Sequence, residues 1–377
     1  MLYKEKSIKR IFILLLALVL SVQVIIATKN QEEFNLNYDQ QKEIVHFVEN
    51  QIIESYSNYY TIPTINVEIE SVNVRDNQLI IDLKANITKV LKVNSALELP
   101  YVKGMLEEIS NIRDKYDFDR AKRYAENLIK DLNYNYIGVE QNENADFQMQ
   151  IPIIAERSNL YNTRCNLLFK DENKDTLTME EFAPLSEEML EKDGKRYINN
   201  IIEHQKYSIK SSSPGNYDRI IARDYVRKWS DACGDCHCSD CDPSKLVYNP
   251  YYANYHNNDC ANFVSQAIHE AGVPTDDKWR PGNRCWYNTG HEGDGLIDYM
   301  VEEGLFFETN DRYKAFAGSI IKWTEVSHVG MVDQNDTVTM TFCAHTDDRN
   351  SCAFRNIRGL TFFVPVWDSY SNQWTPQ

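Results

Sequence analysis

The sequence predicts an α+β fold for this chain of 377 residues, which is long enough for two domains with a core each. Residues 38–205 mix stretches with helical spacing of apolar residues and stretches in which apolar and polar residues alternate. In the remainder, helical patterns come first, and alternating runs follow from about residue 315 to residue 366. Helices and strands that are segregated along the chain in this way are typical of an α+β domain.

The stretch Ser-Ser-Ser-Pro-Gly-Asn at 211–216 has the composition of a linker. We therefore expect a smaller α+β accessory domain at 38–205, a linker at 206–216 and a second domain at 217–377. The accessory domain is expected to contain a helix at 44–53, strands at 65–69 and 79–83 joined by a turn at 75–77, a helix at 121–132, a strand at 147–153 and a helix at 189–204. It shows no catalytic constellation, which indicates a binding or spacer module or a plain scaffold.

The first 29 residues are expected to direct export. Lys4, Lys6, Lys9 and Arg10 precede a run at 11–27 that contains no charged residue, and a basic start followed by an apolar run is typical of an export signal. The run is near the lower limit for one membrane span, so residues 1–29 are predicted to be a signal peptide or a membrane anchor. Either would place the remainder outside the cytoplasmic membrane, where cysteines can be oxidised.

The charge of the chain excludes one class of partner. The formal net charge is −16, whereas proteins that bind nucleic acids need a basic face. We therefore expect no nucleic-acid partner, and membrane contact only through the N-terminal segment. The sequence does not predict an oligomeric state.

Cys260 falls in the first turn of a predicted helix. Gly272 and Pro274 end this helix, and Asn258 or Asp259 can cap its start. The buried stripe of the helix consists of Phe263, Val264, Ala267, Ile268 and Ala271. Backbone N–H groups and the positive end of the helix dipole favour a thiolate at Cys260 and can hold an oxyanion, so this cysteine is the candidate nucleophile. The alternative is a buried or disulfide-bonded structural cysteine.

A histidine opens the strand predicted after residue 327. His328 is followed by Val-Gly-Met-Val, then by a turn expected at 333–336 and by a second alternating run at 338–345. In that run Thr339, Thr341, Cys343 and His345 share one face of the strand. A cysteine at a helix N-terminus, followed by a hairpin with a histidine and then a polar residue, is the chain order of papain-like thiol hydrolases.

Together these segments resemble the putative amidase domain family of secreted Gram-positive bacterial proteins, a relative of CHAP-type and other papain-like cell-wall hydrolases. The resemblance covers about residues 217–365. Its motifs are Asn249-Pro250-Tyr251-Tyr252, Asp259-Cys260-Ala261-Asn262-Phe263-Val264-Ser265-Gln266, Trp286, His328-Val329-Gly330-Met331-Val332 and Ala344-His345-Thr346-Asp347. The resemblance implies a papain-like fold with Cys260 as nucleophile, His328 as general base and His345 as third polar residue, with Asp347 as the alternative.

The chain departs from the family pattern at two places. Residues 231–245 look like an insertion, and Gly318-Ser319 stands where such hydrolases often carry Gly-Asp. The insertion contains four cysteines with the spacing C-x-x-C-x-C-x-x-C, namely Cys233, Cys236, Cys238 and Cys241. They could hold a structural zinc ion, although the spacing is cramped for one. They could also form disulfides, with Cys285, Cys343 or Cys352 as further partners.

Aromatic residues flank Cys260 on both sides. Tyr248, Tyr251, Tyr252, Tyr255, Trp279, Trp286 and Tyr287 could line a groove for a sugar-peptide polymer, or they could be core residues. Asn254, Asn257, Asn258 and Asp259 are candidates for an oxyanion donor or a substrate contact.

These patterns predict a secreted cysteine amidase or peptidase that hydrolyses an amide bond, with cell-wall peptide as the expected substrate. Cys260 would attack the carbonyl, His328 would take and return the proton, and a thioester would be released to water without a cofactor. Transfer of the acyl group to an amine would use the same thioester. The alternative from another class is a non-catalytic surface or wall-binding protein in which Cys260 forms a disulfide.

Overall fold

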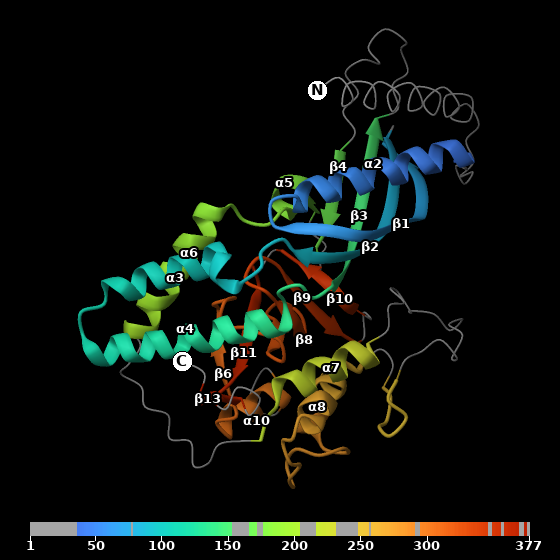
Figure 1. The fold of residues 1–377 in the computed structure, drawn as a ribbon. Helices are drawn as coiled ribbons and strands as arrows, with labels where there is room; N and C mark the ends of the chain where they lie inside the picture. The colour runs from blue at the N-terminus through green and yellow to red at the C-terminus, as the bar shows by residue number, and fades with distance from the viewer. Residues whose placement is uncertain are drawn as a thin grey trace. The chain divides into compact units, whose positions relative to one another are not determined.

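The computed structural model confirms the α+β class (Figure 1). It describes residues 36–76, 78–152, 166–171, 176–203, 216–230, 248–255, 258–290, 295–345, 349–355, 358–368 and 373–374. Within these ranges, no helix is both long enough and apolar enough to cross a membrane. The export segment predicted at 1–29 lies outside them and stays a prediction.

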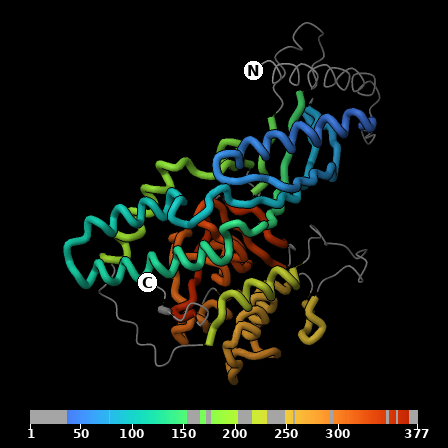
Figure 2. The backbone as a smooth tube through the Cα atoms, viewed as in Figure 1, coloured from blue at the N-terminus to red at the C-terminus, as the bar shows by residue number. Residues whose placement is uncertain are grey.

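The chain forms two compact units and passes through each of them twice (Figure 2). Unit 1 comprises residues 1–92 and 140–184, and unit 2 comprises residues 93–139 and 185–377. Two stretches that the sequence assigned to the accessory domain therefore belong to the same compact unit as the C-terminal part of the chain. The linker predicted at 206–216 lies outside the described residues except for Asn216, and that boundary stays a prediction.

Unit 1 is a helix packed on an antiparallel sheet. Helix α2 (Tyr38–Tyr56) begins at a capping box, in which Asn37 and Gln40 each accept a hydrogen bond from the other's backbone N–H. Its buried residues Ile44, Val48, Ile52 and Tyr56 follow the four-residue spacing of one helix face. The antiparallel strands lie in the order β1 (Tyr60–Arg75), β2 (Gln78–Leu91), β3 (Gln141–Pro152), β4 (Asn166–Lys170) and β5 (Thr176–Thr178), and helix α5 (Met179–Phe182) follows.

The core of unit 1 contains an ion pair that the sequence did not reveal. The ammonium of Lys89 contacts the carboxylate of Glu143, and both side chains are fully buried. The Tyr56 hydroxyl donates to the same carboxylate, and the rings of Tyr56 and Tyr60 lie 5.3 and 5.1 Å from the Lys89 nitrogen. A buried charge is tolerated only when it is paired in this way.

Unit 2 contains a group of helices from the two halves of its chain. Helices α3 (Pro100–Asn111), α4 (Lys115–Asn135) and α6 (Glu187–Glu203) pack on one another, and the short helix η1 (Ala96–Glu98) precedes them. A Cβ atom at Gly104 would lie 2.0 Å from the carbonyl oxygen of Glu191, and one at Gly194 would lie 2.1 Å from that of Tyr101. Glycine therefore permits the close crossing of α3 and α6.

The sheet of unit 2 is antiparallel, and helices α7 (Arg219–Trp229) and α8 (Cys260–Glu270) pack against its strand β8. Short helices α9 (Arg284–Tyr287) and α10 (Leu296–Glu302) follow α8, and strands β12 (Trp367–Asp368) and β13 (Gln373–Trp374) form a separate pair. The strand order is β10 (Arg349–Phe354), β9 (Met340–Ala344), β8 (His328–Asn335), β7 (Ile320–Trp323), β11 (Leu360–Pro365) and β6 (Phe306–Thr309).

The turn between β8 and β9 differs from the one predicted. It was expected at 333–336, but β8 continues to Asn335, with a bulge between Val332 and Gln334. The turn starts at Asp336, whose carboxylate accepts hydrogen bonds from the N–H groups of Val338 (3.0 Å) and Thr339 (2.8 Å). Asp333, Gln334 and Asn335 of the predicted turn are therefore part of a buried strand, although all three are polar.

Candidate active site

Cys260 is the first residue of α8, as the sequence predicted, and it is 7 % exposed. Asp259 precedes it at the N-cap position, and its carbonyl oxygen accepts the first helical hydrogen bond from Phe263 N at 2.8 Å. Of the two caps that the sequence offered, Asn258 and Asp259, the structure has Asp259 at the N-cap position, but its side chain makes no capping bond. The N–H groups of the first helical turn thus receive no capping bond from the Asp259 side chain.

The Asp259 carboxylate instead holds other parts of the chain. Its Oδ1 accepts hydrogen bonds from Tyr255 N at 2.9 Å and from Asn262 Nδ2 at 2.8 Å, and its Oδ2 lies 2.7 Å from Nδ1 of His345. Asp259 is 1 % exposed. The expectation that Asp259 contacts a substrate or oxyanion is therefore wrong, since burial and these three bonds occupy its carboxylate.

His345 is the predicted site histidine that the structure places in direct contact with the start of α8. Besides its bond to Asp259, its Nε2 lies 2.8 Å from the carbonyl oxygen of Trp229, at the end of α7. The Phe263 ring stacks on the imidazole with 3.8 Å between centroids, and His345 is 2 % exposed. Both ring nitrogens thus contact protein oxygens, and the role of His345 as orienting partner of His328 stays a prediction.

His328 is the first residue of β8 and is half-buried. It pairs with Trp323 of β7, and their rings lie 4.7 Å apart. The next residue, Val329, packs in the same core cluster as Cys260 and Phe263. His328 therefore lies at the end of the strand against which α8 packs, next to the core that contains the candidate nucleophile.

A short segment at 286–290 connects the surroundings of Cys260 with those of His328. The Trp286 indole donates to Asn262 Oδ1 at 2.7 Å, in the first turn of α8. Three residues later, the hydroxyls of Thr289 and Ser327 lie 2.7 Å apart, directly before His328. The Lys322 ammonium donates to the carbonyl of Gly290 at 2.6 Å. This segment therefore fixes the start of α8 and the start of β8 relative to each other.

The other polar residues of α8 hold neighbouring elements in place. The Ser265 hydroxyl donates to the carbonyl of Trp286 at 2.8 Å. Gln266 accepts from the Tyr225 hydroxyl at 2.6 Å, and that hydroxyl accepts from Asn249 at 3.1 Å. The sequence motif around Cys260 thus contains one candidate nucleophile and several residues whose bonds are structural.

The aromatic residues near Cys260 divide into two groups. Trp279 and Trp286 are fully buried, as expected for core residues. Tyr251 is 91 % exposed and Tyr255 is 43 % exposed, and the Tyr255 ring meets that of Tyr287 edge-on at 4.7 Å. Tyr251 and Tyr255 are therefore accessible to a ligand, whereas Trp279 and Trp286 are not.

The cysteines differ in what they can do. Cys343 is a free thiol buried in the core, and burial raises its pKa to about 12, which disfavours a thiolate nucleophile at this position. The cluster of Cys233, Cys236, Cys238 and Cys241 lies outside the described residues, as does Asp347. In the part of the chain that the structure describes, no group of three His, Cys, Asp or Glu residues could hold a metal ion.

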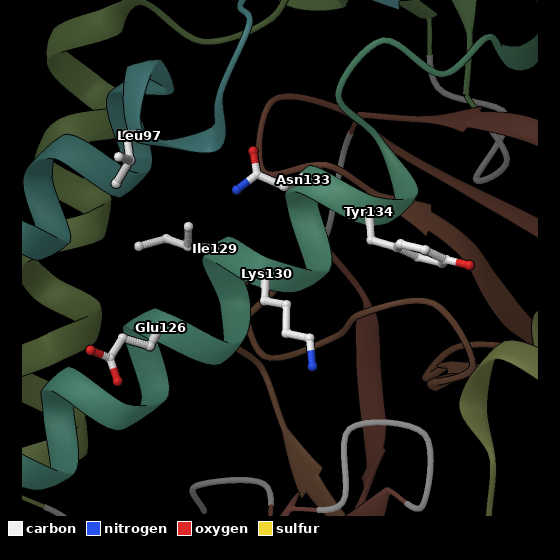
Figure 3. A pocket seen from close by; sticks show the side chains of 6 residues that line it. All are labelled: Leu97, Glu126, Ile129, Lys130, Asn133 and Tyr134. Carbon is white, nitrogen blue, oxygen red and sulfur yellow. The ribbon is translucent and has the colours of Figure 1, made fainter.

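A surface hollow lies away from these groups, along helix α4 (Figure 3). It is lined by side chains of η1 and α4, namely Leu97, Glu126, Ile129, Lys130, Asn133 and Tyr134. None of these residues is a cysteine or a histidine. The lining is mostly hydrocarbon with one carboxylate and one ammonium. It contains none of the candidate site residues.

Residues 216–361 match the model of one protein family, described as a putative amidase domain. The match confirms the resemblance found in the sequence, and it contains Cys260, His328 and His345. Such a domain suggests a hydrolase that acts on amide bonds. No curated protein and no solved structure matches the chain.

Proposed function

We propose that residues 216–361, as a domain of the amidase family that they match, hydrolyse an amide bond with Cys260 as the nucleophile. The observation that carries this proposal is the position of Cys260 at the first residue of α8. The N-terminal end of a helix favours the thiolate over the thiol, and a thiolate attacks a carbonyl far better. The N–H groups of the same turn, which the Asp259 side chain does not cap, are donors of the type that can hold the oxyanion that follows.

His328 is proposed as the general base. A base must reach both the thiol and the substrate, and His328 is half-buried at the start of β8, beside the segment that also binds the first turn of α8. His345, the other histidine of the motifs, is buried, and both of its ring nitrogens contact protein oxygens. For the residue that orients the His328 imidazole we propose Asp347, the alternative to His345, because both ring nitrogens of His345 contact other protein oxygens.

The proposed substrate is a peptide of the bacterial cell wall. It is supported by the predicted export segment at 1–29, by the family match and by the exposed Tyr251 and Tyr255 near Cys260, which offer ring faces and hydroxyls to a sugar-peptide polymer. The protein would then act outside the cytoplasmic membrane. The cysteine cluster at 233–241 is proposed to stabilise the loop before the site, through zinc or disulfides. The zinc content and free thiols of the intact protein distinguish these two chemistries.

The test is incubation of the full chain with purified peptidoglycan and identification of the released fragments by mass spectrometry. We expect wild-type protein to release fragments with new amide-bond ends and Cys260→Ala to release none while staying folded. Cys343→Ala is the matched control, because it removes a buried thiol of the same domain and should leave turnover unchanged. Turnover by folded Cys260→Ala would overturn the proposal. A Cys260 that resists iodoacetamide without reductant, together with binding but no cleavage, would favour the wall-binding alternative.

A further inference from the structure

The residue before the nucleophile joins the start of α8 to two other parts of unit 2, a loop and the end of a strand. The Asp259 carboxylate binds Tyr255 N in the preceding loop, the Asn262 side chain in the first helical turn, and His345 at the end of β9. His345 carries the connection on to the Trp229 carbonyl at the end of α7. At the start of α8, the Asp259 side chain is therefore bonded to a loop and to a strand end, and His345 links that strand end to the end of α7.

The hydrogens in this network can be counted. A carbonyl oxygen only accepts, so Nε2 of His345 must carry the hydrogen that it gives to Trp229. One further hydrogen then lies between Nδ1 of His345 and Oδ2 of Asp259, which are 2.7 Å apart. Whichever atom carries it, every polar atom of the pair is bonded in a buried site, and such bonds restrict geometry strongly.

We propose that Asp259 and His345 form a positioning pair, which fixes the first turn of α8 and thereby the direction in which Cys260 presents its sulfur. The proposal rests on the proposed function, because it assigns a role within that same site. Neither residue is a catalytic residue: both are buried, and the Phe263 ring covers one face of the imidazole. They act on the reaction through the backbone of residues 259 and 260, which also carries the N–H groups of the proposed oxyanion site.

The use of the Asp259 side chain supports this role. An aspartate at an N-cap usually accepts a bond from a backbone N–H of the first turn, and that bond would compete with an oxyanion for the same donors. Here Oδ1 binds the Asn262 side chain instead of a backbone N–H of that turn. The carboxylate thus holds the turn in place while it leaves the donors of the helix N-terminus uncapped by Asp259.

The variants Asp259→Asn and Asp259→Ala distinguish the loss of the hydrogen-bond geometry from the loss of the carboxylate charge. In Asp259→Asn, the amide nitrogen can donate to Nδ1 of His345 while the amide oxygen keeps the bonds from Tyr255 and Asn262, so the network survives without the carboxylate. Asp259→Ala removes it altogether. His345→Phe removes both imidazole bonds but keeps a ring stacked on Phe263. Gln266→Met is the control, because it breaks a buried bond of α8 to Tyr225 that lies outside the network.

The experiment measures kcat and KM on peptidoglycan fragments, the rate of Cys260 alkylation by iodoacetamide, and the thermal midpoint, all on the full chain. We expect Asp259→Ala and His345→Phe each to lower kcat about tenfold to hundredfold with KM within about twofold, since misplaced reacting groups cost rates of this order. The double variant should be no slower than either single variant, because the two residues act as a unit. Asp259→Asn should stay within about threefold of wild type.

Wild-type kcat and alkylation rates in folded His345→Phe would overturn the proposal, and so would an Asp259→Asn variant as slow as Asp259→Ala. A role in stability alone would lower the thermal midpoint, as Gln266→Met is expected to do, without slowing the alkylation of the folded protein. If Asp259→Ala does not fold, His345→Phe supplies the same comparison. Failure of the proposed function is distinguishable, because the alkylation rates report on Cys260 even where no amide bond is cleaved.

Discussion

Arg219 of α7 is buried between two carboxylates of unit 2, and removal of one of them should be costly. Its Nε lies 3.1 Å from Oδ2 of Asp368, its backbone N donates to Oδ1 of the same residue at 3.3 Å, and its Nη2 contacts Asp131 of α4. Burial alone would lower the pKa of the guanidinium, but the charges of Asp131 and Asp368 outweigh it and raise the pKa above its ordinary value. Arg219 therefore stays charged and needs both partners.

Asp131→Ala leaves this buried guanidinium with one carboxylate. Removal of one member of a buried ion pair costs about 3–5 kcal/mol, and the remaining Asp368 places the expected loss at the lower end, about 3 kcal/mol. That loss changes the unfolding equilibrium by a factor of about 10². The matched control is Glu126→Ala on the same helix, which removes an exposed pair with Lys122 at 3.8 Å and should cost less than about 0.5 kcal/mol.

Urea unfolding followed by tryptophan fluorescence measures these losses, since every tryptophan of the chain lies at or beyond residue 229 and so in unit 2. A shift for Asp131→Ala as small as that for Glu126→Ala would refute the reasoning. If the expected loss is found, α4 belongs to the same cooperative unit as the domain at 216–361. A fragment at 206–377 would then lack a partner of Arg219, and assays of the site need the full chain.

Three further predictions concern other buried or catalytic groups. His328→Ala should slow the alkylation of Cys260 near neutral pH, because an imidazolium partner lowers the pKa of a thiol; an unchanged rate would remove His328 as the base. Burial raises the pKa of Cys343 to about 12, so its thiol stays protonated below that pH. At pH 9 we therefore expect iodoacetamide to label Cys343 in unfolded but not in folded protein, as measured by peptide mass spectrometry. Labelling of the folded chain would contradict its burial. Glu143→Gln should destabilise unit 1 by about 3–5 kcal/mol, because it leaves the buried Lys89 ammonium without its carboxylate. Lys89→Met in the Glu143→Gln background should recover much of this loss of stability. A loss below about 1 kcal/mol for Glu143→Gln alone, measured by circular dichroism during unfolding, would show that the ion pair is not needed.

Residue periodicity predicted the elements that expose one face to a core. The helices expected at 44–53 and 121–132 lie within α2 and α4, and the helix expected at 189–204 coincides with α6 up to Glu203, the last described residue of that stretch. The two faces of β9 are also as predicted, with Cys343 packed in the core of Cys260 and Phe342 in a second core. Local spacing carries this information because helical and extended backbones repeat every 3.6 and 2 residues.

Elements without a regular apolar pattern were missed. Helix α3 begins with a proline, and its packing against α6 depends on Gly104 and Gly194. Tertiary contacts rather than apolar spacing therefore define this helix. The buried pair of Lys89 and Glu143 lies on neighbouring strands at positions that read as exposed charges in the sequence. Only the strand register brings the two opposite charges together.

The site illustrates the same division between local and distant information. That Cys260 begins a helix follows from its neighbours in the chain, because apolar spacing and the helix stop at Gly272 are local signals. The use of Asp259 is not a local property. By composition it is an N-cap residue, yet its carboxylate binds His345, which is 86 residues away, and the fold alone decides between these two uses. The same motif on a helix without a histidine at the facing strand end would leave the carboxylate to cap the first turn, where it would compete with an oxyanion. The chemistry expected of Cys260 therefore depends on β9 as much as on the motif that contains it.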